Sequence, residues 1–293
     1  MGQNLLNQPH LTDERAAYDF LASLRWPDGI TCPHCKGIKV YKLNLSNTRR
    51  QVLKCAKCRK QFSATVGTIF EDSHIPLTKW LMALHLFASS KKGISAHQLH
   101  RMLGITYKSA WFMGHRIRHA MKPTPYGGKL GGIVEADETY IGGKTRGQGK
   151  GITNKKPVFA LVERGGQVRS FPIQFVTSRN LKKILNEHVS PDAKIMTDEG
   201  MGYQGLKQDF ADHQTVNHSK MEYVRGEAGT NTVEGYFSLL KRGLTGTYHH
   251  VSEHHLHRYL NEFNFRYNAR NENDAARAML AMRRTEGKRL LYK

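Results

Sequence analysis

Acidic residues are scarce in this sequence, and their scarcity limits the partners that the chain can bind. The 293 residues include 24 Asp and Glu against 45 Lys and Arg, which gives a formal net charge of +21 at pH 7. Such a surplus of positive charge repels basic partners and attracts polyanions. We expect the partner to be a nucleic acid, because its long ladder of phosphates can neutralise a charge of this size.

The sequence also lacks long hydrophobic runs and a secretory leader. One of the longest apolar runs, WLMALHLFA at residues 80–88, is far too short to cross a bilayer. The first twenty residues contain no basic start followed by an apolar stretch. We therefore expect no membrane partner, and a cytoplasmic protein that is associated with the nucleoid when it is bound to DNA.

Cysteine is rare, and all four cysteines fall in two CxxC pairs. Each pair can place two thiolates on one tight turn, and two such turns complete the tetrahedral shell of one structural Zn²⁺. No cysteine is left over for a disulfide, which favours a reducing compartment. A redox pair or incidental cysteines would be the alternative. The predicted zinc ligands are Cys32, Cys35, Cys55 and Cys58.

The segment that holds these pairs, residues 30–70, is predicted to form a zinc ribbon. Short strands around VYKL and QVLKC would join the two turns. Residues 31–70 contain nine Lys and Arg and no acid, so we expect the ribbon to lie on DNA, with a plainly solvated basic face as the alternative. Ahead of it, residues 1–29 are expected to hold one short helix over residues 11–26, capped by Thr12.

Residues 71–121 show the apolar periodicity of helices and are predicted to form a small all-α domain. Ser95 and Thr106 can cap two of these helices, and Gly104 can form the turn between them. The pattern favours a helix-turn-helix whose last helix enters the major groove, although a generic three-helix bundle has the same periodicity. The side chains of that helix expected to face DNA are Tyr107, Lys108, Ser109, Arg116 and Arg118.

The stretch KPTPYGGKLGG at residues 122–132 is the clearest linker, and the periodicity of strands follows it. Residues 133–275 are predicted to form an α/β domain with a mixed sheet. Residues 276–293 are expected to be a basic C-terminal tail. The expected strands are IVEADETYI, PVFALVER, QVRSFPIQFV, AKIMT and a segment near HQTVN, with helices at about 178–188, 230–243 and 252–270.

Three acids of this domain lie at positions that favour chemistry. Asp137 lies within an apolar strand, Asp198 ends a strand, and Glu234 lies on a helix. Lys241 follows Glu234 by seven residues, so both project from one helical face. Taken singly, each aspartate could equally be a solvated strand end or a cap.

The order of these motifs resembles prokaryotic insertion-sequence transposases of the DDE, RNase H-like superfamily, in the branch with an N-terminal zinc ribbon. The resemblance spans about residues 15–270 and is carried by RWPDGITCPHC, the two CxxC pairs, ADETYIGG, MTDEG and NTVEGYFSLLKRG. It implies a first Asp on the first strand, a second Asp after the fourth strand, and a third acid on a late helix with a basic residue after it. These roles match Asp137, Asp198, Glu234 and Lys241. Some members of the branch use Asn as the third residue, and Asn231 lies one turn before Glu234.

The resemblance implies a DNA transposase that binds the terminal repeats of a mobile element, then cleaves and transfers strands. Carboxylates that converge at one sheet edge suit two Mg²⁺ or Mn²⁺ ions, because their repulsion needs a cation and hard oxygen ligands prefer these metals. We expect a homodimer or larger assembly on double-stranded DNA. A DNA-binding regulator without catalysis and a related nuclease without strand transfer are the alternatives.

Weaker signals surround these motifs. Glu135 shares a strand face with Asp137 and is expected to support it, whereas Glu138 should point to the opposite face. The basic stretch after the first strand is expected to contact the DNA backbone through Lys144, Arg146 and Lys150. The histidines of residues 249–257 could hold a second zinc, although contact with phosphate or an ordinary surface is the favoured interpretation.

Overall fold

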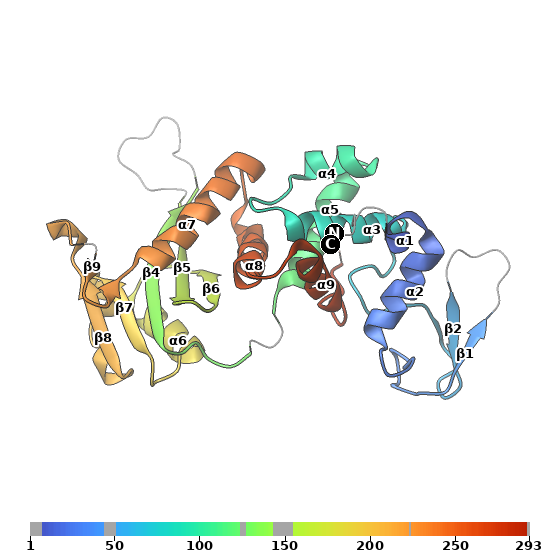
Figure 1. The fold of residues 1–293 in the computed structure, drawn as a ribbon, viewed down its shortest axis with the longest axis horizontal. Helices are drawn as coiled ribbons and strands as arrows, with labels where there is room; N and C mark the ends of the chain where they lie inside the picture. Colours follow the sequence, from blue (N-terminus) through green and yellow to red (C-terminus); the bar gives the residue numbers. More distant parts are fainter. Residues whose placement is uncertain (1–7, 44–50, 124–126, 143–154, 223, 292–293) are drawn as a thin grey trace. The chain divides into compact units, whose positions relative to one another are not determined.

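The computed structural model describes residues 8–43, 51–123, 127–142, 155–222 and 224–291. The chain forms two compact units (Figure 1). Unit 1 comprises Met1–Lys122 together with Glu272–Lys293, and unit 2 comprises Pro123–Asn271. Both ends of the chain therefore belong to the same unit, and unit 2 is inserted between them. The multidomain architecture expected from the sequence is confirmed.

The first part of unit 1 is a pair of short helices followed by a small antiparallel sheet. Asp13, not Thr12, caps the main helix, because its carboxylate accepts a hydrogen bond from Ala16 N at 2.7 Å. The sheet has the order β1-β2-β3. These elements are α1 (Pro9–Thr12), α2 (Glu14–Arg25), β1 (Val40–Leu43), β2 (Val52–Cys55) and β3 (Gln61–Phe62).

The next part of unit 1 consists of α3 (Leu77–Ser89), α4 (Ala96–Leu103) and α5 (Tyr107–Met121). The side chains of Ser95 and Thr106 cap α4 and α5, each by accepting a hydrogen bond from a backbone N–H at 3.1 Å. Gly104 ends α4 in the left-handed region, with φ of 57°. The structure therefore has the short turn between α4 and α5 that the sequence pattern predicts.

A further helix of unit 1, α9 (Asp274–Arg283), lies where the sequence suggested only a basic tail. It packs mainly on α3, and its Ala281 and Met282 are buried. The segment after it closes over the end of α5, where Arg284 and Lys288 donate hydrogen bonds to backbone carbonyls of that helix. Residues 272–293 are thus part of the folded helical unit.

Two expected DNA contacts are absent from the surface because other segments of unit 1 cover them. Arg116 and Arg118 are only 5% and 3% exposed. Arg116 donates hydrogen bonds to the carbonyls of Ile69 and Leu290, at 2.8 and 3.2 Å, and the Arg118 guanidinium lies over the Phe87 ring at 5.2 Å. Periodicity counted both as outward-facing, but segments from distant parts of the sequence cover them.

Unit 2 contains a five-stranded mixed sheet with the order β6-β5-β4-β7-β8 (Figure 1). The strands β4, β5 and β6 pair antiparallel, whereas β7 and β8 run parallel to β4. The mixed sheet predicted from the sequence is confirmed, with β4 as its central strand. The strands are β4 (Ile133–Ile141), β5 (Lys156–Glu163), β6 (Val168–Pro172), β7 (Lys194–Asp198) and β8 (Asp212–Val216).

Helices cover both faces of this sheet. On one face, α6 (Ser178–His188) packs through Leu181 and Leu185 against alternate residues of the central strands. On the other face, α7 (Asn231–Gly243) and α8 (Glu253–Asn268) pack against Ala160 and Val162. A two-stranded ribbon, β9 (Val224–Arg225) and β10 (Ala228–Gly229), leads into α7.

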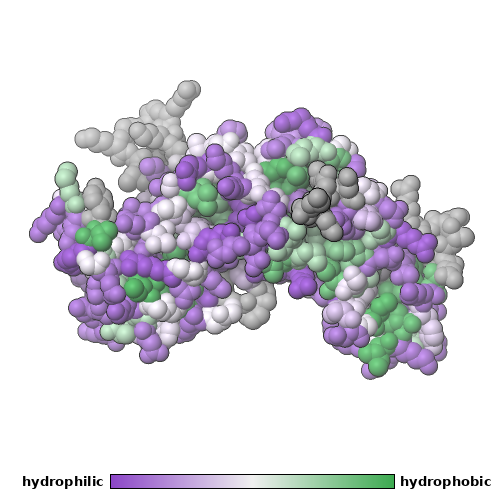
Figure 2. Space-filling model, in the orientation of Figure 1, coloured by the Kyte–Doolittle hydropathy of each residue, from purple (hydrophilic) through white to green (hydrophobic). Residues whose placement is uncertain are grey.

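The surface agrees with the charged composition. Hydrophilic residues cover most of the face that Figure 2 shows. Within the described ranges, none of the helices has the length and apolar character needed to cross a membrane.

The contribution of α9 can be tested by ending the chain after Asn271. We expect unit 1 to be strongly destabilised, because loss of the buried Met282 side chain alone should cost roughly 2–5 kcal/mol. Limited proteolysis with mass spectrometry should show new cleavage in α3 and α5. Unchanged resistance of these helices in the shortened chain would contradict the role of α9.

Candidate functional site

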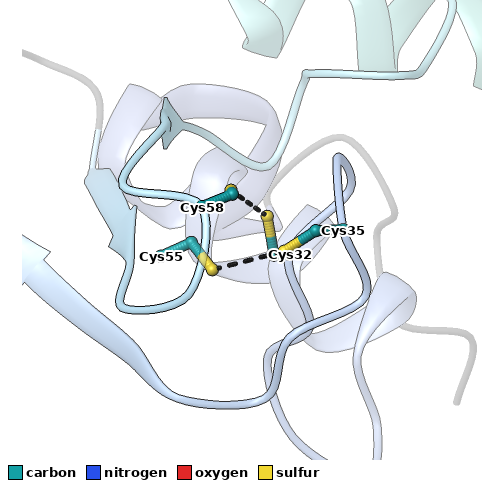
Figure 3. Close-up of side chains that lie close together, drawn as sticks. All are labelled: Cys32, Cys35, Cys55 and Cys58. Atoms are coloured by element: carbon teal, nitrogen blue, oxygen red, sulfur yellow. Dashed lines mark hydrogen bonds between the residues drawn. The ribbon is translucent and has the colours of Figure 1, made fainter.

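The four cysteines form a compact metal site in unit 1 (Figure 3). Their sulfur atoms all lie within 4.8 Å of one another, and the Cys32–Cys58 and Cys35–Cys55 sulfur distances are 3.7 and 3.6 Å. A tetrahedral Zn²⁺ with Zn–S bonds of about 2.3 Å requires sulfur separations of about 3.8 Å. The residues present therefore fit one zinc ion with four thiolate ligands.

The two cysteine turns repeat the same backbone design. In each, the residue after the second cysteine adopts a left-handed conformation, with φ of 59° at Lys36 and 60° at Arg59. The N–H groups of Lys36 and Arg59 donate to the carbonyls of Cys32 and Cys55 at 2.9 and 3.0 Å. Gly37 follows the first turn, where a Cβ would lie 3.2 Å from the Cys55 sulfur. Any larger residue there would crowd the metal ligands.

In unit 2, the sheet places two of the predicted catalytic acids on neighbouring strands. Glu135 of β4 pairs with Met196 of β7 in parallel register, and Asp137 and Asp198 each follow two residues later on the same strands. Because side chains alternate along a strand, both aspartates lie on the face that carries α7. The structure therefore brings Asp137 and Asp198 side by side at one end of the sheet.

Backbone N–H groups orient both aspartates. One oxygen of Asp137 accepts a hydrogen bond from Glu138 N at 2.7 Å, and one oxygen of Asp198 accepts from Gly200 N at 2.9 Å. A Cβ at Gly200 would lie 2.9 Å from that Asp198 oxygen, so glycine is needed for the close approach. These hydrogen bonds hold one oxygen of each carboxylate in a fixed position.

The third predicted acid, Glu234, is mounted on the first turn of α7. Thr230 donates a hydrogen bond from its hydroxyl to Glu234 Oε1 at 2.9 Å, which orients the carboxylate. Asn231 and Lys241 are exposed on the same helix. Both Glu234 and Asn231 are thus placed where a third ligand is expected, and the hydrogen bond favours Glu234.

Electrostatics show that the three acids are neighbours. The pKa of Asp137 is raised to about 7, mainly by burial and further by the nearby carboxylates of Glu138, Asp198 and Glu234, against the opposing effect of the Glu138 N–H. Among the described residues, the four cysteines are the group of three or more potential ligands that lie close enough together to hold one metal ion, and the carboxylates of the three acids do not form a second such group. The acids form an open anionic centre.

Glu138 is a fourth acid at this end of the sheet whose partner the sequence did not reveal. Burial raises its pKa, and Asp198 contributes to the increase. Its carboxylate accepts a hydrogen bond from the hydroxyl of Tyr203, on the face that packs against α6. Tyr203 is 1% exposed and follows Asp198 by five residues, but only the fold shows that it meets Glu138.

The expected DNA contacts have different outcomes. Tyr107 is 45% exposed and Lys108 is exposed at the start of α5, with Ser109 half-buried beside them. Arg116 and Arg118 are buried, as described above, and are no longer candidates. Lys144, Arg146 and Lys150 lie outside the described residues. The histidines of residues 249–257 form no group of metal ligands within the described part of the chain.

Comparison with known proteins shows the family of the chain. Residues 129–268, which include all three predicted acids, match the ISXO2-like transposase domain, and residues 12–61 match the transposase zinc-ribbon domain. A protein of Halobacterium salinarum, described as an uncharacterized protein in transposable element ISH50, is 30% identical over 272 residues. That alignment covers 86% of this chain and 90% of the relative. The chain belongs to the ISXO2-like transposase family.

Membership of the ISXO2-like transposase family confirms the resemblance drawn from the motifs. The zinc-ribbon match contains all four cysteines, and their geometry shows that the ribbon can bind one zinc ion. The transposase-domain match begins just before β4 and ends with α8, so it coincides with the folded sheet and the helices that cover it.

The zinc site predicts the effect of two substitutions. Cys55→Ser should lower the zinc content from one ion per chain to nearly none, because one of four ligands is lost. Gly37→Ala should retain the ligands but weaken binding, because its Cβ would crowd the Cys55 sulfur. Competition with a chromogenic chelator would measure both changes, and a Gly37→Ala variant with unchanged zinc affinity would contradict the crowding argument.

The raised pKa of Asp137 predicts how stability depends on pH. Between the ordinary value of 3.8 and the folded value of about 7, the folded chain retains a proton that the unfolded chain has lost. For the zinc-loaded chain without added Mg²⁺ or Mn²⁺, the contribution of this group to stability should therefore be complete below pH 3.8, decrease as the pH rises toward 7, and then level off. The Asp137→Asn variant should show a smaller decrease in melting temperature between pH 5 and pH 8. An equal decrease in both proteins would assign the effect to other groups.

Proposed function

We propose that this transposase-family chain binds the terminal repeats of a mobile DNA element and catalyses divalent-metal-dependent strand cleavage and strand transfer. The observation that supports this most directly is the register of β4 and β7. It places Asp137 and Asp198 at equivalent positions on adjacent parallel strands, with Glu234 near enough to affect the pKa of Asp137.

The donor set suits Mg²⁺ or Mn²⁺. These hard cations prefer carboxylate oxygens, and a bound cation would offset the repulsion among the neighbouring acids. Asp137, Asp198 and Glu234 are the proposed ligands. When bound, two such ions would activate the attacking oxygen and stabilise the leaving oxygen of a phosphodiester.

Other residues of the chain would hold the DNA. Lys241 lies on the exposed side of α7, two turns from Glu234, where its ammonium group can bind a phosphate near the acids. In unit 1, Tyr107, Lys108 and Ser109 at the start of α5 are the proposed groove contacts, since the first residues of a recognition helix reach base edges. The basic zinc ribbon would bind the DNA backbone.

Because strand transfer requires two element ends to be held together, we propose that the active form on DNA is at least a homodimer. A nuclease that cleaves without joining is the second candidate, because it would use the same acids. A DNA-binding regulator without catalysis is less well supported, because it has no need of acids on rigid strands and a helix.

The proposal is tested by replacing the acids with amides of equal size. Asp137→Asn, Asp198→Asn and Glu234→Gln should each lower Mg²⁺-dependent cleavage of DNA that carries the element ends by several orders of magnitude, while DNA binding is retained. Gel assays would separate cleavage from strand transfer, and a mobility-shift assay would measure binding. The control for the identity of the third ligand is Asn231→Ala. Normal cleavage by Asp198→Asn would show that the site is misplaced.

A further inference from the structure

The carboxylate of Glu135 is buried next to the acidic centre and accepts its hydrogen bonds from protein groups. Glu135 is 1% exposed and precedes Asp137 by two residues on β4. Its Oε2 accepts hydrogen bonds from Thr232 N at 2.7 Å and Val233 N at 2.9 Å. Its Oε1 accepts from the Thr232 hydroxyl at 2.8 Å and from Arg164 Nε at 2.6 Å. Both oxygens are therefore fully engaged by protein donors.

These contacts fasten the N-terminus of α7 to β4. The first N–H groups of a helix have no partner within the helix and are usually capped by the side chain of the preceding residue. Thr230 occupies that position but makes no cap hydrogen bond, because its hydroxyl is directed to Glu234 instead. Glu135 supplies the cap from another element, and its negative charge also suits the positive end of the helix.

Arg164 completes the attachment. Its side chain donates hydrogen bonds to the carbonyls of Glu227 and Gly229 at 2.8 and 3.1 Å, in the segment that enters α7. It also forms an ion pair with Glu135, which offsets the cost of burying that charge. One ionic pair thus holds both the start of α7 and the chain that leads into it.

The consequence concerns the distance between two acids. Asp137 lies two residues after Glu135 on β4, and Glu234 follows Val233 on α7. We infer that Glu135 and Arg164 are positioning residues that set the separation between the Asp137 and Glu234 carboxylates, and that Glu135 is not itself a metal ligand. The inference rests on the proposed function, in which these two acids bind a divalent cation.

The substitution Glu135→Gln tests this role without changing the volume of the side chain. Each oxygen of Glu135 accepts two hydrogen bonds, so a glutamine NH₂ group would face protein donors in either orientation. The substitution should therefore loosen the attachment of α7 while leaving the proposed ligands Asp137, Asp198 and Glu234 intact.

Glu14→Gln is a matched control in unit 1. Glu14 also caps a helix from a distant segment, since its carboxylate accepts from Leu77 N at 2.7 Å and Thr78 N at 3.2 Å at the start of α3. The same chemical change there should lower stability without affecting the acidic centre.

The experiment measures binding of Mn²⁺ to the full chain by electron paramagnetic resonance, together with the Mn²⁺ dependence of DNA cleavage. Zinc-loaded protein would be used throughout. We expect Glu135→Gln to weaken Mn²⁺ binding about 10–100-fold, as loss of a group that supports metal ligands usually does, and to raise the Mn²⁺ concentration needed for cleavage. Glu14→Gln should bind Mn²⁺ like the wild type.

Two outcomes separate this inference from the proposed function. If wild-type protein and Asp137→Asn bind Mn²⁺ equally weakly, the proposed metal site is wrong and the inference is lost with it. If the wild type binds Mn²⁺, Asp137→Asn does not, and Glu135→Gln binds normally, only the positioning role is overturned.

Thr232→Val provides a second variant in case Glu135→Gln does not fold. It removes one donor to Glu135 but retains the backbone N–H and a side chain of equal shape. We expect a smaller loss of Mn²⁺ affinity in the same direction. Because Thr232 is not among the proposed ligands, such a loss would support positioning, whereas unchanged affinity in a folded Thr232→Val protein would overturn it.

Discussion

The parallel pairing of β4 with β7 is the constraint on which the acidic centre depends. Hydrogen bonds between these strands fix their register, and that register alone brings Asp137 and Asp198 to the same height on the same face. A shift by one residue would move one aspartate to the opposite face of the sheet. Parallel strands also end at the same edge, which leaves room beyond them for ligands. The backbone register therefore sets the position of Asp137 relative to Asp198, whereas the position of Glu234 depends on how α7 is attached to β4.

Five carboxylates lie at or next to the acidic centre, and the structure stabilises them in different ways. Glu135 has both oxygens hydrogen-bonded and an arginine beside it. Asp137 and Asp198 each receive one backbone N–H, which is too little to offset burial at Asp137 and leaves its pKa at about 7. The fully compensated carboxylate is suited to a structural task, whereas the undercompensated ones are suited to bind a cation. This contrast is the physical basis for separating the positioning residue from the proposed ligands.

Patterns that are local in sequence predicted much of the architecture. The alternation in IVEADETYI, the CxxC pairs, and the caps Ser95 and Thr106 each depend on residues a few positions apart, and the structure contains the strand, the zinc site and the helix starts that they indicate. Contacts between distant segments could not be obtained in this way. The burial of Arg116 depends on carbonyls at Ile69 and Leu290, and no periodicity within α5 indicates them.

The same distinction applies within the candidate site. Glu135 and Thr232 are separated by 97 positions, so the sequence could place Glu135 on the face of Asp137 but could not show what it binds. It also placed Glu138 on the opposite face without indicating its contact with Tyr203. Acids in a basic chain can be recognised as unusual from composition and strand pattern. Their separate roles follow only from the donors that surround each carboxylate, because those donors come from elements that meet only in the folded protein.

The chain topology also links the fold of unit 1 to segments from both ends of the chain. Unit 2 is inserted into unit 1, so two covalent connections, at residues 122–123 and 271–272, join the units. Both connections continue directly into structural elements, α5 on one side and α9 on the other, and these helices contact each other within unit 1. Because α5 and α9 pack together, the fold of unit 1 depends on a segment that follows the whole of unit 2 in the sequence.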